Sequence, residues 1–354
     1  MKTILVTGGA GFVGSHVALR LKQDEGASRV VAFDNLKRRG SELNLARLRG
    51  AGVEFLHGDV RIPTDLAVAG PIDVIVECSA EPSVLAGHSS DPAYVIQTNL
   101  DGLVNCLELA RAHRADIVFL STSRVYPYAT LNSLAATEGE TRFALEDHQA
   151  TPGASRRGVS ELFPLTGRRS LYGATKLAGE ILMQEYLEMY GLRGVINRCG
   201  VIAGPWQMGK IDQGFVTLWL ARHILGGALS YIGFGGRGKQ VRDILDVDDL
   251  CSLLRLQLDR LPEISGEVFN IGGGAENSLS LAELTALCRE LTGREIALGV
   301  SLVERPGDVR VYVSDCAKAE ETLRWRPSKN CRTIVAEVAE WISSHRSLLG
   351  PILT

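Results

Sequence analysis

The chain has 354 residues, of which 45% are hydrophobic and 22% charged, and its formal net charge is -3. These values are typical of a globular protein with one large or two moderate domains, and they exclude a general electrostatic attraction to nucleic acid or membranes. The apolar start of MKTILVTGGAGFVG is too short for a signal peptide or a membrane span, and no later apolar run is long enough. We therefore expect a cytoplasmic protein with no membrane or nucleic-acid partner.

The first two-thirds of the chain alternate strand-like and helix-like segments. The predicted strands are Thr3–Thr7, Val30–Asp34, Val53–His57, Val74–Cys78, Ile117–Ser121 and Gly194–Asn197, with helices such as Gly11–Lys22 and Leu100–Ala112 between them. Short β-branched strands that alternate with helices predict an α/β fold, a Rossmann-type doubly wound parallel sheet. Seven scattered cysteines without a CxxC pair predict reduced thiols and no metal site.

After Ala203 this alternation ends and glycine-rich, mixed segments follow, including a strand-like VFNIGGG and a predicted helix Leu281–Thr292. We expect a smaller domain interleaved with the first. The predicted division assigns 1–202 and a returning 240–268 to the Rossmann domain, and 203–354, mainly 203–239 and 269–354, to a substrate domain.

The opening strand leads directly into Gly9, Gly11 and Gly14, which match GxGxxG between a strand and a helix. Glycines at these positions allow a tight turn and close approach of a pyrophosphate to the helix N-terminus. Asp34 closes the second strand twenty residues later, where a carboxylate can bind the adenosine ribose. Its charge favours NAD over NADP, although three basic residues, Lys37 to Arg39, follow closely.

Asp59, in the segment HGDVR, has two readings. It either contacts the adenine or caps the end of a strand.

Tyr172 and Lys176 are four residues apart and share one face of a predicted helix. Only the small residues Gly173, Ala174 and Thr175 separate them, so a flat group could lie against this face. An ordinary surface helix start is the alternative.

Together, TGGAGFVG, FDN, HGDVR, STSRVY and YGATK resemble the extended short-chain dehydrogenase/reductase family of nucleotide-sugar enzymes, over nearly the whole chain. The resemblance implies that Lys176 binds the nicotinamide ribose and that Tyr172 is the acid/base for a sugar hydroxyl. It also implies that Thr122 hydrogen-bonds the reacting oxygen. The NAD-binding residues implied are Gly8, Gly11, Phe12, Val13, Asp34, Asn35, Asp59, Val60, Ser79, Asn99, Ser121, Tyr172 and Lys176.

Positions 123 and 124 discriminate between the reactions of this family. The 4,6-dehydratases have Asp-Glu there, the decarboxylases a Glu and the epimerase-reductases a Cys, whereas this chain has Ser123 and Arg124. The resemblance therefore favours a redox-neutral epimerase, in which a carbinol is oxidised, the ketone turns, and hydride returns to the other face.

The segments 212–219, 238–245, 269–281 and 305–315 resemble the CDP-paratose 2-epimerase group most, as does the spacing of 46 residues from Tyr126 to Tyr172. The long insert is either an extra wall over the sugar or a variable surface loop. Arg242 and Arg305 match diphosphate-binding arginines of the family. The substrate-binding residues implied are Thr122, Ser123, Arg124, Gln213, Arg242, Arg305 and Asp308.

Two segments depart from the family pattern. The fourth strand ends in Glu77-Cys78-Ser79-Ala80 instead of a His-Leu-Ala-Ala type sequence, and Glu81-Pro82 follow. RCGVIAGP lacks the Asn that 4-epimerases place near the sugar phosphates.

We expect an NAD-dependent epimerase acting at C2 of a CDP- or other NDP-hexose. A UDP-sugar 4-epimerase, a net dehydrogenase or reductase, and a noncatalytic NAD-binding regulator are the alternatives, and a homodimer is the oligomer implied.

Overall fold

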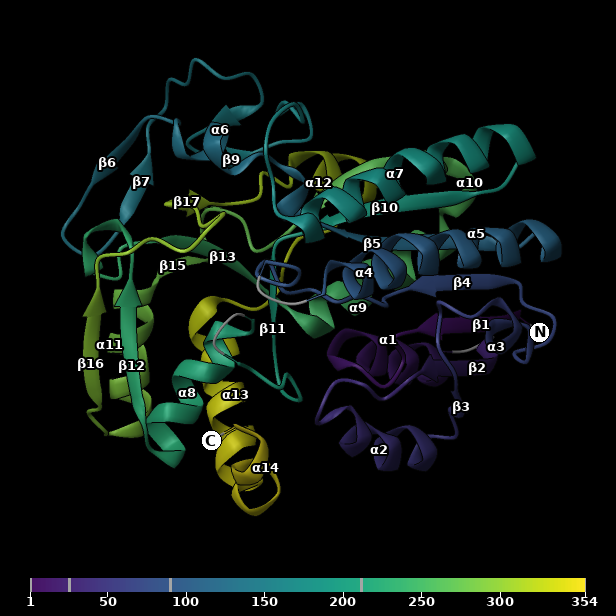
Figure 1. The fold of residues 1–354 in the computed structure, drawn as a ribbon, viewed down its shortest axis with the longest axis horizontal. Helices are drawn as coiled ribbons and strands as arrows, with labels where there is room; N and C mark the ends of the chain where they lie inside the picture. Colours follow the sequence, from purple (N-terminus) through teal and green to yellow (C-terminus); the bar gives the residue numbers. More distant parts are fainter. Residues whose placement is uncertain (1, 25–26, 89–90, 211–212, 354) are drawn as a thin grey trace. The chain divides into compact units, whose positions relative to one another are not determined.

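The computed structural model describes residues 2–24, 27–88, 91–210 and 213–353 (Figure 1). The chain forms two compact units. Unit 1 comprises Met1–Val125, Leu171–Arg198 and Cys251–Phe269, and unit 2 comprises Tyr126–Ser170, Cys199–Leu250 and Asn270–Thr354. The predicted division differs from these ranges mainly in two segments, 126–170 and 240–250, which it assigns to the Rossmann domain and which belong to unit 2.

Unit 1 is built on a seven-stranded sheet with the order β14-β10-β5-β4-β1-β2-β3. The strand pairs β1–β2, β2–β3, β1–β4 and β4–β5 are parallel. The strands are β1 (Lys2–Thr7), β2 (Ala27–Asp34), β3 (Glu54–His57), β4 (Val74–Glu77), β5 (Asp116–Thr122), β10 (Gly194–Cys199) and β14 (Val268–Ile271). The order reverses between β1 and β4, so the predicted doubly wound, Rossmann-type sheet is confirmed.

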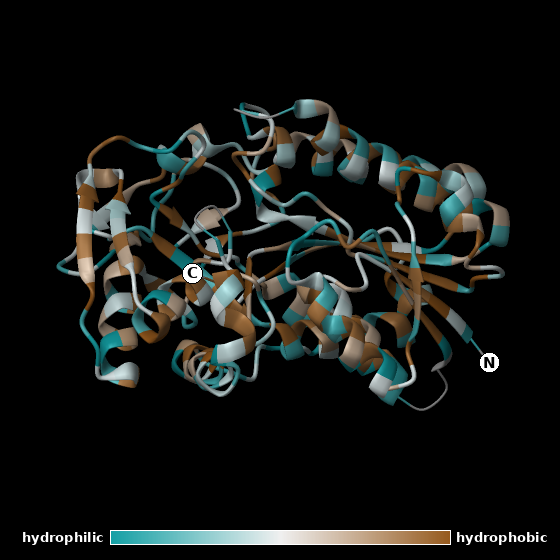
Figure 2. Cartoon of the chain, turned by 60° about the horizontal axis from the view of Figure 1, so that its bottom comes forward, coloured by the Kyte–Doolittle hydropathy of each residue, from teal (hydrophilic) through white to brown (hydrophobic). Residues whose placement is uncertain are grey.

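Helices cover both faces of this sheet (Figures 1 and 2). The helices α5 (Gly102–His113) and α7 (Leu171–Tyr190) lie on one face, and α1 (Phe12–Gln23) lies on the other. Figure 2 shows the strands between them as largely hydrophobic. Leu5, Ile75 and Ile117 of the strands form a fully buried cluster with Leu107 of α5 and Met183 of α7. Burial on both faces explains why these strands read as continuous apolar runs.

The predicted start of the helix at Leu100 is two residues too early. Residues Gln97–Asp101 form a π-helical turn, η2, between α4 (Pro92–Ile96) and α5. Such turns interrupt the regular helical spacing, and they are frequent at functional sites. The remaining elements of unit 1 are η1 (Ser41–Leu43), α2 (Asn44–Gly50), α3 (Pro63–Ala67), η3 (Ser123–Val125) and α10 (Leu261–Ile264), and α9 (Val247–Asp259) begins in unit 2.

Unit 2 contains a sheet of β11 (Val201–Ala203), β13 (Val241–Asp246) and β15 (Ser278–Ser280), with β17 (Val311–Tyr312) paired to β13. A second pair, β12 (Ala228–Ile232) and β16 (Ala297–Ser301), is parallel. The helix α8 (Phe215–Leu225) packs against α11 (Leu281–Thr292) and α13 (Cys331–Ser344). Asp212, the first residue of one segment singled out above, lies outside the described residues. The other elements are η4 (Phe234–Gly236), α12 (Ala317–Leu323) and α14 (Arg346–Leu353).

The long insert is an ordered part of unit 2. It contains α6 (Tyr128–Asn132), the hairpin β6 (Ala136–Glu138) and β7 (Phe143–Leu145), and the hairpin β8 (Ala154–Ser155) and β9 (Gly158–Val159). Phe143 donates its N–H to the carbonyl of Lys239 at 3.1 Å and packs against Val241 and Val311. The side chain of Arg142 forms an ion pair with Glu283 of α11 at 2.5 Å. These contacts exclude a loosely attached surface loop.

Candidate active site

The glycine motif forms a tight connection between β1 and α1. Gly8 has φ 61°, and its carbonyl accepts a hydrogen bond from Gly11 N at 2.9 Å. A Cβ atom on Gly14 would lie 2.1 Å from the same carbonyl, so only glycine fits there. The helix α1 begins with Phe12 and Val13, and its N-cap residue Gly11 provides no side-chain cap. This backbone cradle fits a pyrophosphate at the positive end of α1.

Asp34 closes β2 beside this cradle. Its carboxylate accepts backbone hydrogen bonds from Ala10 N at 3.1 Å and from Leu36 N at 2.7 Å. Burial raises the pKa of Asp34, while the backbone donors oppose that shift. Asn44 holds the loop from the other side through Ala10 O at 2.9 Å, a contact that the sequence analysis missed. A carboxylate held at the end of β2 in this way is suited to accept hydrogen bonds from the hydroxyls of an adenosine ribose.

Asp59 lies in a polar cluster after β3. Its carboxylate accepts hydrogen bonds from Asn35 Nδ2 at 3.0 Å and from the backbone and side chain of Arg61, with 2.7 Å to Arg61 Nη2. Hydrogen bonds from Arg61 lower the pKa of Asp59 to about 2. These contacts make Asp59 a cap at the end of β3, and its contact with the adenine stays a prediction. Val60, the next residue, is buried, and its carbonyl accepts a hydrogen bond from Asn105 of α5.

The predicted catalytic residues come from two elements that touch within unit 1. Thr122 ends β5 and is 6% exposed, and its Oγ1 accepts a hydrogen bond from Arg124 N at 3.2 Å. Tyr172 lies in the first turn of α7. A Cβ atom on Gly173 would lie 2.1 Å from Arg124 O, so the small residue after the tyrosine lets α7 approach the end of β5. This contact explains part of the small-residue spacing between Tyr172 and Lys176.

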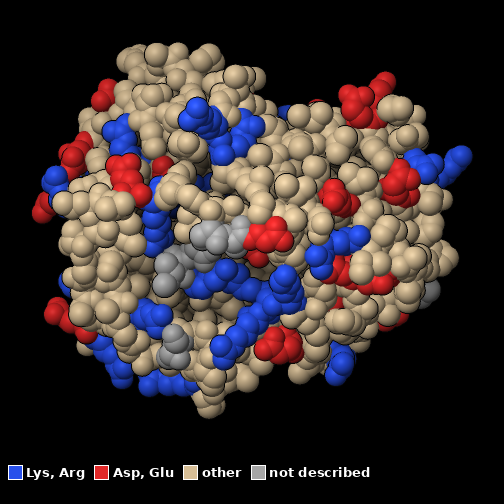
Figure 3. Space-filling model, viewed as in Figure 1, with Lys and Arg blue, Asp and Glu red and all other residues tan. Residues whose placement is uncertain are grey.

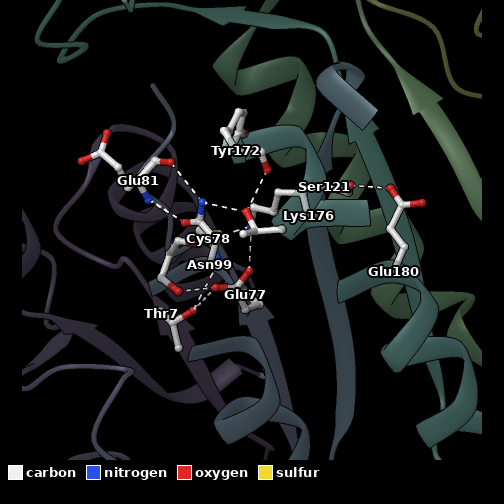
Figure 4. A network of polar contacts seen from close by, with 11 residues as sticks. Thr7, Glu77, Cys78, Glu81, Asn99, Ser121, Tyr172, Lys176 and Glu180 are labelled. Atoms are coloured by element: carbon white, nitrogen blue, oxygen red, sulfur yellow. Dashed lines mark hydrogen bonds and ion pairs between the residues drawn. The ribbon is translucent and has the colours of Figure 1, made fainter. Parts of the chain in front are cut away.

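Lys176 is almost fully buried, with 2% exposure, and it contacts Glu77 at the end of β4. Lys176 Nζ lies 3.3 Å from Glu77 Oε2 and 3.4 Å from Ser79 O (Figure 4). The ammonium also lies 4.5 Å from the centroid of the Phe119 ring. From the sequence, Glu77 stands out only as a departure from the family pattern, without a predicted role.

Asn99 joins the π-helical turn to the segment after β4. Its side chain accepts from Glu81 N at 2.7 Å and donates to Glu81 O at 3.2 Å and to Thr175 Oγ1 at 3.2 Å (Figure 4). Asn99 therefore braces Glu81 and α7 next to Lys176.

The hydroxyl of Ser121 donates to the buried carboxylate of Glu180 (Figure 4), which in turn forms an ion pair with Arg198 at 2.7 Å. The sequence predicts Ser121 at the cofactor. In the structure its hydroxyl is directed to this buried network.

The predicted substrate residues Gln213, Arg242, Arg305 and Asp308 all belong to unit 2. Arg242 in β13 forms an ion pair with Asp308 at 2.7 Å. Arg305 and Asp308 are the two ends of a turn, which is closed by a hydrogen bond from Asp308 N to Arg305 O at 3.1 Å. Gly307 within this turn has a positive φ of 72°. Gln213 forms an antiparallel bridge with Lys210. Thr122, Ser123 and Arg124 belong to unit 1.

Two further findings bear on the site. None of the helices in the described part of the chain is long and apolar enough to cross a membrane. No group of His, Cys, Asp and Glu residues within the described ranges could hold a metal ion, and none of the seven cysteines, all of them described, forms a disulfide.

A Rossmann-type sheet, a glycine cradle and a tyrosine–lysine pair define the class as a dinucleotide-dependent enzyme. Comparison with known proteins agrees. Residues 4–272 match the NAD dependent epimerase/dehydratase family, and the chain belongs to this family. The predicted family, NAD cofactor and epimerase enzyme are thereby confirmed.

Several relatives are similar over nearly the full length. A CDP-paratose 2-epimerase from Salmonella typhi is 32% identical, with 96% of this chain and 99% of that protein covered. A dTDP-glucose 4,6-dehydratase from Streptomyces griseus is 30% identical, with coverage of 99% and 97%. Among solved structures, the dTDP-glucose 4,6-dehydratase of Streptomyces venezuelae with NAD bound has a TM-score of 0.79 at 28% identity, covering 99% of both chains. The UDP-glucose 4-epimerase of Thermotoga maritima has a TM-score of 0.77 at 26% identity, covering 97% and 99%.

Proposed function

We propose that this protein is a redox-neutral nucleotide-sugar epimerase that inverts C2 of a CDP- or other NDP-hexose. The observation that carries the proposal is the end of β5. Thr122 is followed by Ser123 and Arg124, which stand where dehydratases of the family place an Asp-Glu pair, and Gly173 packs against the Arg124 carbonyl. The chain thus keeps the residues for oxidation of a carbinol and lacks the acid/base pair for elimination.

NAD, when bound, would supply reversible hydride transfer at the sugar carbon, which allows the ketone to be reduced on its other face. The glycine cradle and Asp34 would hold its pyrophosphate and adenosine ribose, and Lys176 its other ribose. Tyr172 removes the proton of the sugar hydroxyl and returns it after the ketone has turned. Thr122 hydrogen-bonds the reacting oxygen and orients it toward the phenol. General acid–base catalysis by such a group contributes typically about 10²–10⁴-fold.

Unit 2 supplies the proposed groups for the nucleotide diphosphate. Arg242 and Arg305 are suited to bidentate contact with phosphate oxygens. Lys and Arg side chains also gather on part of the face shown in Figure 3, which suits an anionic ligand. Gln213 and Asp308 complete the proposed substrate-binding residues of unit 2, and Ser123 and Arg124 are the proposed ones of unit 1 beside Thr122.

The experiment uses a panel of nucleotide sugars followed by NMR, and then the accepted sugar deuterated separately at C2 and at C4. Oxidation at C2 predicts a primary isotope effect for the C2 label only, when chemistry limits the rate. It also predicts that the C2 label is retained in the product. A primary isotope effect for the C4 label alone would support the 4-epimerase alternative. UDP-glucose 4-epimerases are among the proteins to which the chain is similar.

A redox-neutral cycle requires the cofactor to stay bound until the ketone is reduced. We therefore expect NAD to co-purify with the protein and to be released on denaturation. Stoichiometric consumption of added NAD by a cofactor-free protein would instead establish a net dehydrogenase. Binding of NAD without turnover of any nucleotide sugar would establish a noncatalytic regulator.

We also propose that the protein is a homodimer through α5 and α7. On α7, Ile181 and Met189 are 54% and 68% exposed, which is unusual for large apolar side chains of one helix. Light scattering at micromolar concentration should give twice the mass of the chain, and Ile181→Glu should shift it toward the monomer. A monomeric wild type would contradict the proposal.

A further inference from the structure

We propose that Glu77 is a positioning residue, the counter-ion of Lys176, that sets how strongly the Lys176 ammonium favours ionisation of the Tyr172 phenol. This inference deepens the proposed function and rests on the roles of Tyr172 and Lys176 in it. Glu77 is the last residue of β4.

The Glu77 carboxylate is fully engaged inside unit 1 (Figure 4). Its exposure is 1%. One oxygen, Oε2, faces Lys176 Nζ at 3.3 Å. The other, Oε1, accepts hydrogen bonds from the hydroxyls of Ser79 and Thr7, the latter at 3.5 Å. Thr7 Oγ1 in turn accepts from Cys78 N at 3.3 Å, so β1 and β4 together fix the carboxylate.

A buried ammonium needs a compensating charge. Lys176 is 2% exposed, and transfer of an unpaired cation into such an environment is strongly unfavourable. Within the described residues, Lys176 Nζ also contacts the carbonyl of Ser79 and the ring of Phe119, both of which are uncharged. Glu77 therefore supplies the charge that makes burial of Lys176 tolerable.

The same pairing limits the effect of Lys176 on its neighbours. An isolated ammonium one helical turn from a phenol stabilises the phenolate, whereas an ammonium with a carboxylate at 3.3 Å acts as a dipole with a weaker field. Among the described residues, the Cys106 thiol of α5 interacts electrostatically with both Glu77 and Lys176, and the buried ion pair of Glu180 with Arg198 lies one helical turn further along α7. Burial raises the pKa of Cys106 well above its ordinary value, so Cys106 stays neutral.

Removal of the Glu77 charge should leave the cation uncompensated. The phenolate of Tyr172 then becomes easier to form. The test measures the ionisation of Tyr172 by ultraviolet absorbance as a function of pH. The absorbance of the Tyr172→Phe variant of each protein is subtracted, so that the difference reports the tyrosinate of Tyr172 alone. Glu77→Gln keeps the size and hydrogen-bonding capacity of the side chain. Glu77→Gln should move the titration midpoint of Tyr172 down by about one pH unit relative to the wild type. Glu77→Asp keeps the negative charge, so its midpoint should lie closer to that of the wild type. An unchanged or upward-shifted titration in Glu77→Gln overturns the proposal.

A stability cycle provides the second readout. Lys176→Met leaves the Glu77 carboxylate buried and unpaired, and the double variant with Glu77→Gln removes that charge. We expect the double variant to be at least as stable in urea as Lys176→Met alone. If Glu77→Gln alone does not fold, recovery of folding in the double variant supports the pairing, and failure of both overturns it. Asp116→Asn is the control, because it breaks the ion pair with Arg193 at the opposite end of β5. It should lower stability without moving the titration of Tyr172.

Neither readout requires a sugar substrate. Absence of epimerisation across the nucleotide-sugar panel would therefore reject the proposed function and still leave the role of Glu77 measurable. Conversely, an active epimerase whose Glu77→Gln variant titrates like the wild type would reject only this inference.

Discussion

The guanidinium of Arg242 donates a hydrogen bond to the carboxylate of Asp308, with 2.7 Å between Nη2 and Oδ1. Its Nη1 also donates to Val241 O at 2.7 Å. Arg242 is thus fixed on β13, and Asp308 is fixed at the end of the turn that begins with Arg305. This pair links a strand to the turn that carries the second proposed phosphate-binding arginine.

We predict that Arg242→Ala raises KM for the nucleotide sugar by about 10- to 100-fold, because charge-assisted hydrogen bonds to phosphate are lost. Bound NAD should be unchanged, since the predicted cofactor-binding residues belong to unit 1. Asp308→Asn should have a smaller effect, because the arginine remains. Initial-rate kinetics and the NAD content of the purified variants provide the measurements. Arg237→Ala, which alters a largely exposed ion pair with Glu138, is the control. Equal KM values for both arginine variants would remove Arg242 from the substrate site.

The chemical roles at the end of β5 and the start of α7 are separable. Tyr172→Phe should retain the fold and the NAD while turnover falls by about 10²–10⁴-fold, because only the proton-transfer group is removed. Thr122→Val should cost less, since it removes a hydrogen bond to the reacting oxygen and leaves the base in place. Turnover numbers of the two variants, at matched NAD content, test the order. A loss below about tenfold in Tyr172→Phe would mean that another residue carries the proton.

The sequence predicted the sheet of unit 1 well because buried parallel strands and the glycine motif are local signals. All six predicted strands are present, and the predicted helix Leu281–Thr292 has the observed bounds, helped by a capping box between Ser280 and Glu283. The glycine turn and Asp34 also meet as expected. The π-helical turn at Gln97–Asp101 was not predicted, because its hydrogen bonds span five residues instead of four and this difference leaves no pattern in the local sequence.

The contacts that the sequence did not reveal join residues far apart in the chain. Glu77 and Lys176 are 99 positions apart, and Arg142 and Glu283 are 141 positions apart. Local spacing carries no information on such pairs. Glu77 did give a signal, because a carboxylate in an apolar strand needs a buried partner. The insert gave none, because its many polar residues are equally typical of a surface loop.

Asn132, at the end of α6, connects the long insert to the turn from Arg305 to Asp308, and we predict that this connection supports substrate binding. Its Nδ2 donates to Asp308 O at 3.0 Å, and its Oδ1 accepts from Arg310 N at 2.9 Å. Asn132→Ala should loosen the turn from Arg305 to Asp308. KM for the nucleotide sugar should rise about fivefold, with kcat and bound NAD little changed, since the lost bonds are neutral. Ser133→Ala, at the next position, removes only an exposed local hydrogen bond to Thr130 and is the control. Equal kinetics for both variants would mean that the insert does not support the substrate site.

The last prediction concerns acid stability and Asp59. Hydrogen bonds from Arg61 lower the pKa of Asp59 from 3.8 to about 2 in the folded protein. Because the folded value lies below the unfolded one, the stabilisation is complete above pH 3.8 and is lost as the pH falls through about 2. Because the Arg61 side chain is partly exposed, solvent screens its interaction with Asp59. We therefore expect this interaction to contribute about 1 kcal/mol to the free energy of unfolding at neutral pH.

Asp59→Asn should therefore lower the free energy of unfolding in urea by about 1 kcal/mol at pH 6, and by about half as much near pH 3. The matched control is Glu276→Gln, which makes the same change of charge at an exposed position. Its difference from the wild type should be smaller at pH 6. A destabilisation by Asp59→Asn that stays constant over this pH range would show that the Asp59 charge does not stabilise the fold. Its place would then be set by packing and by neutral hydrogen bonds, such as the one from Asn35.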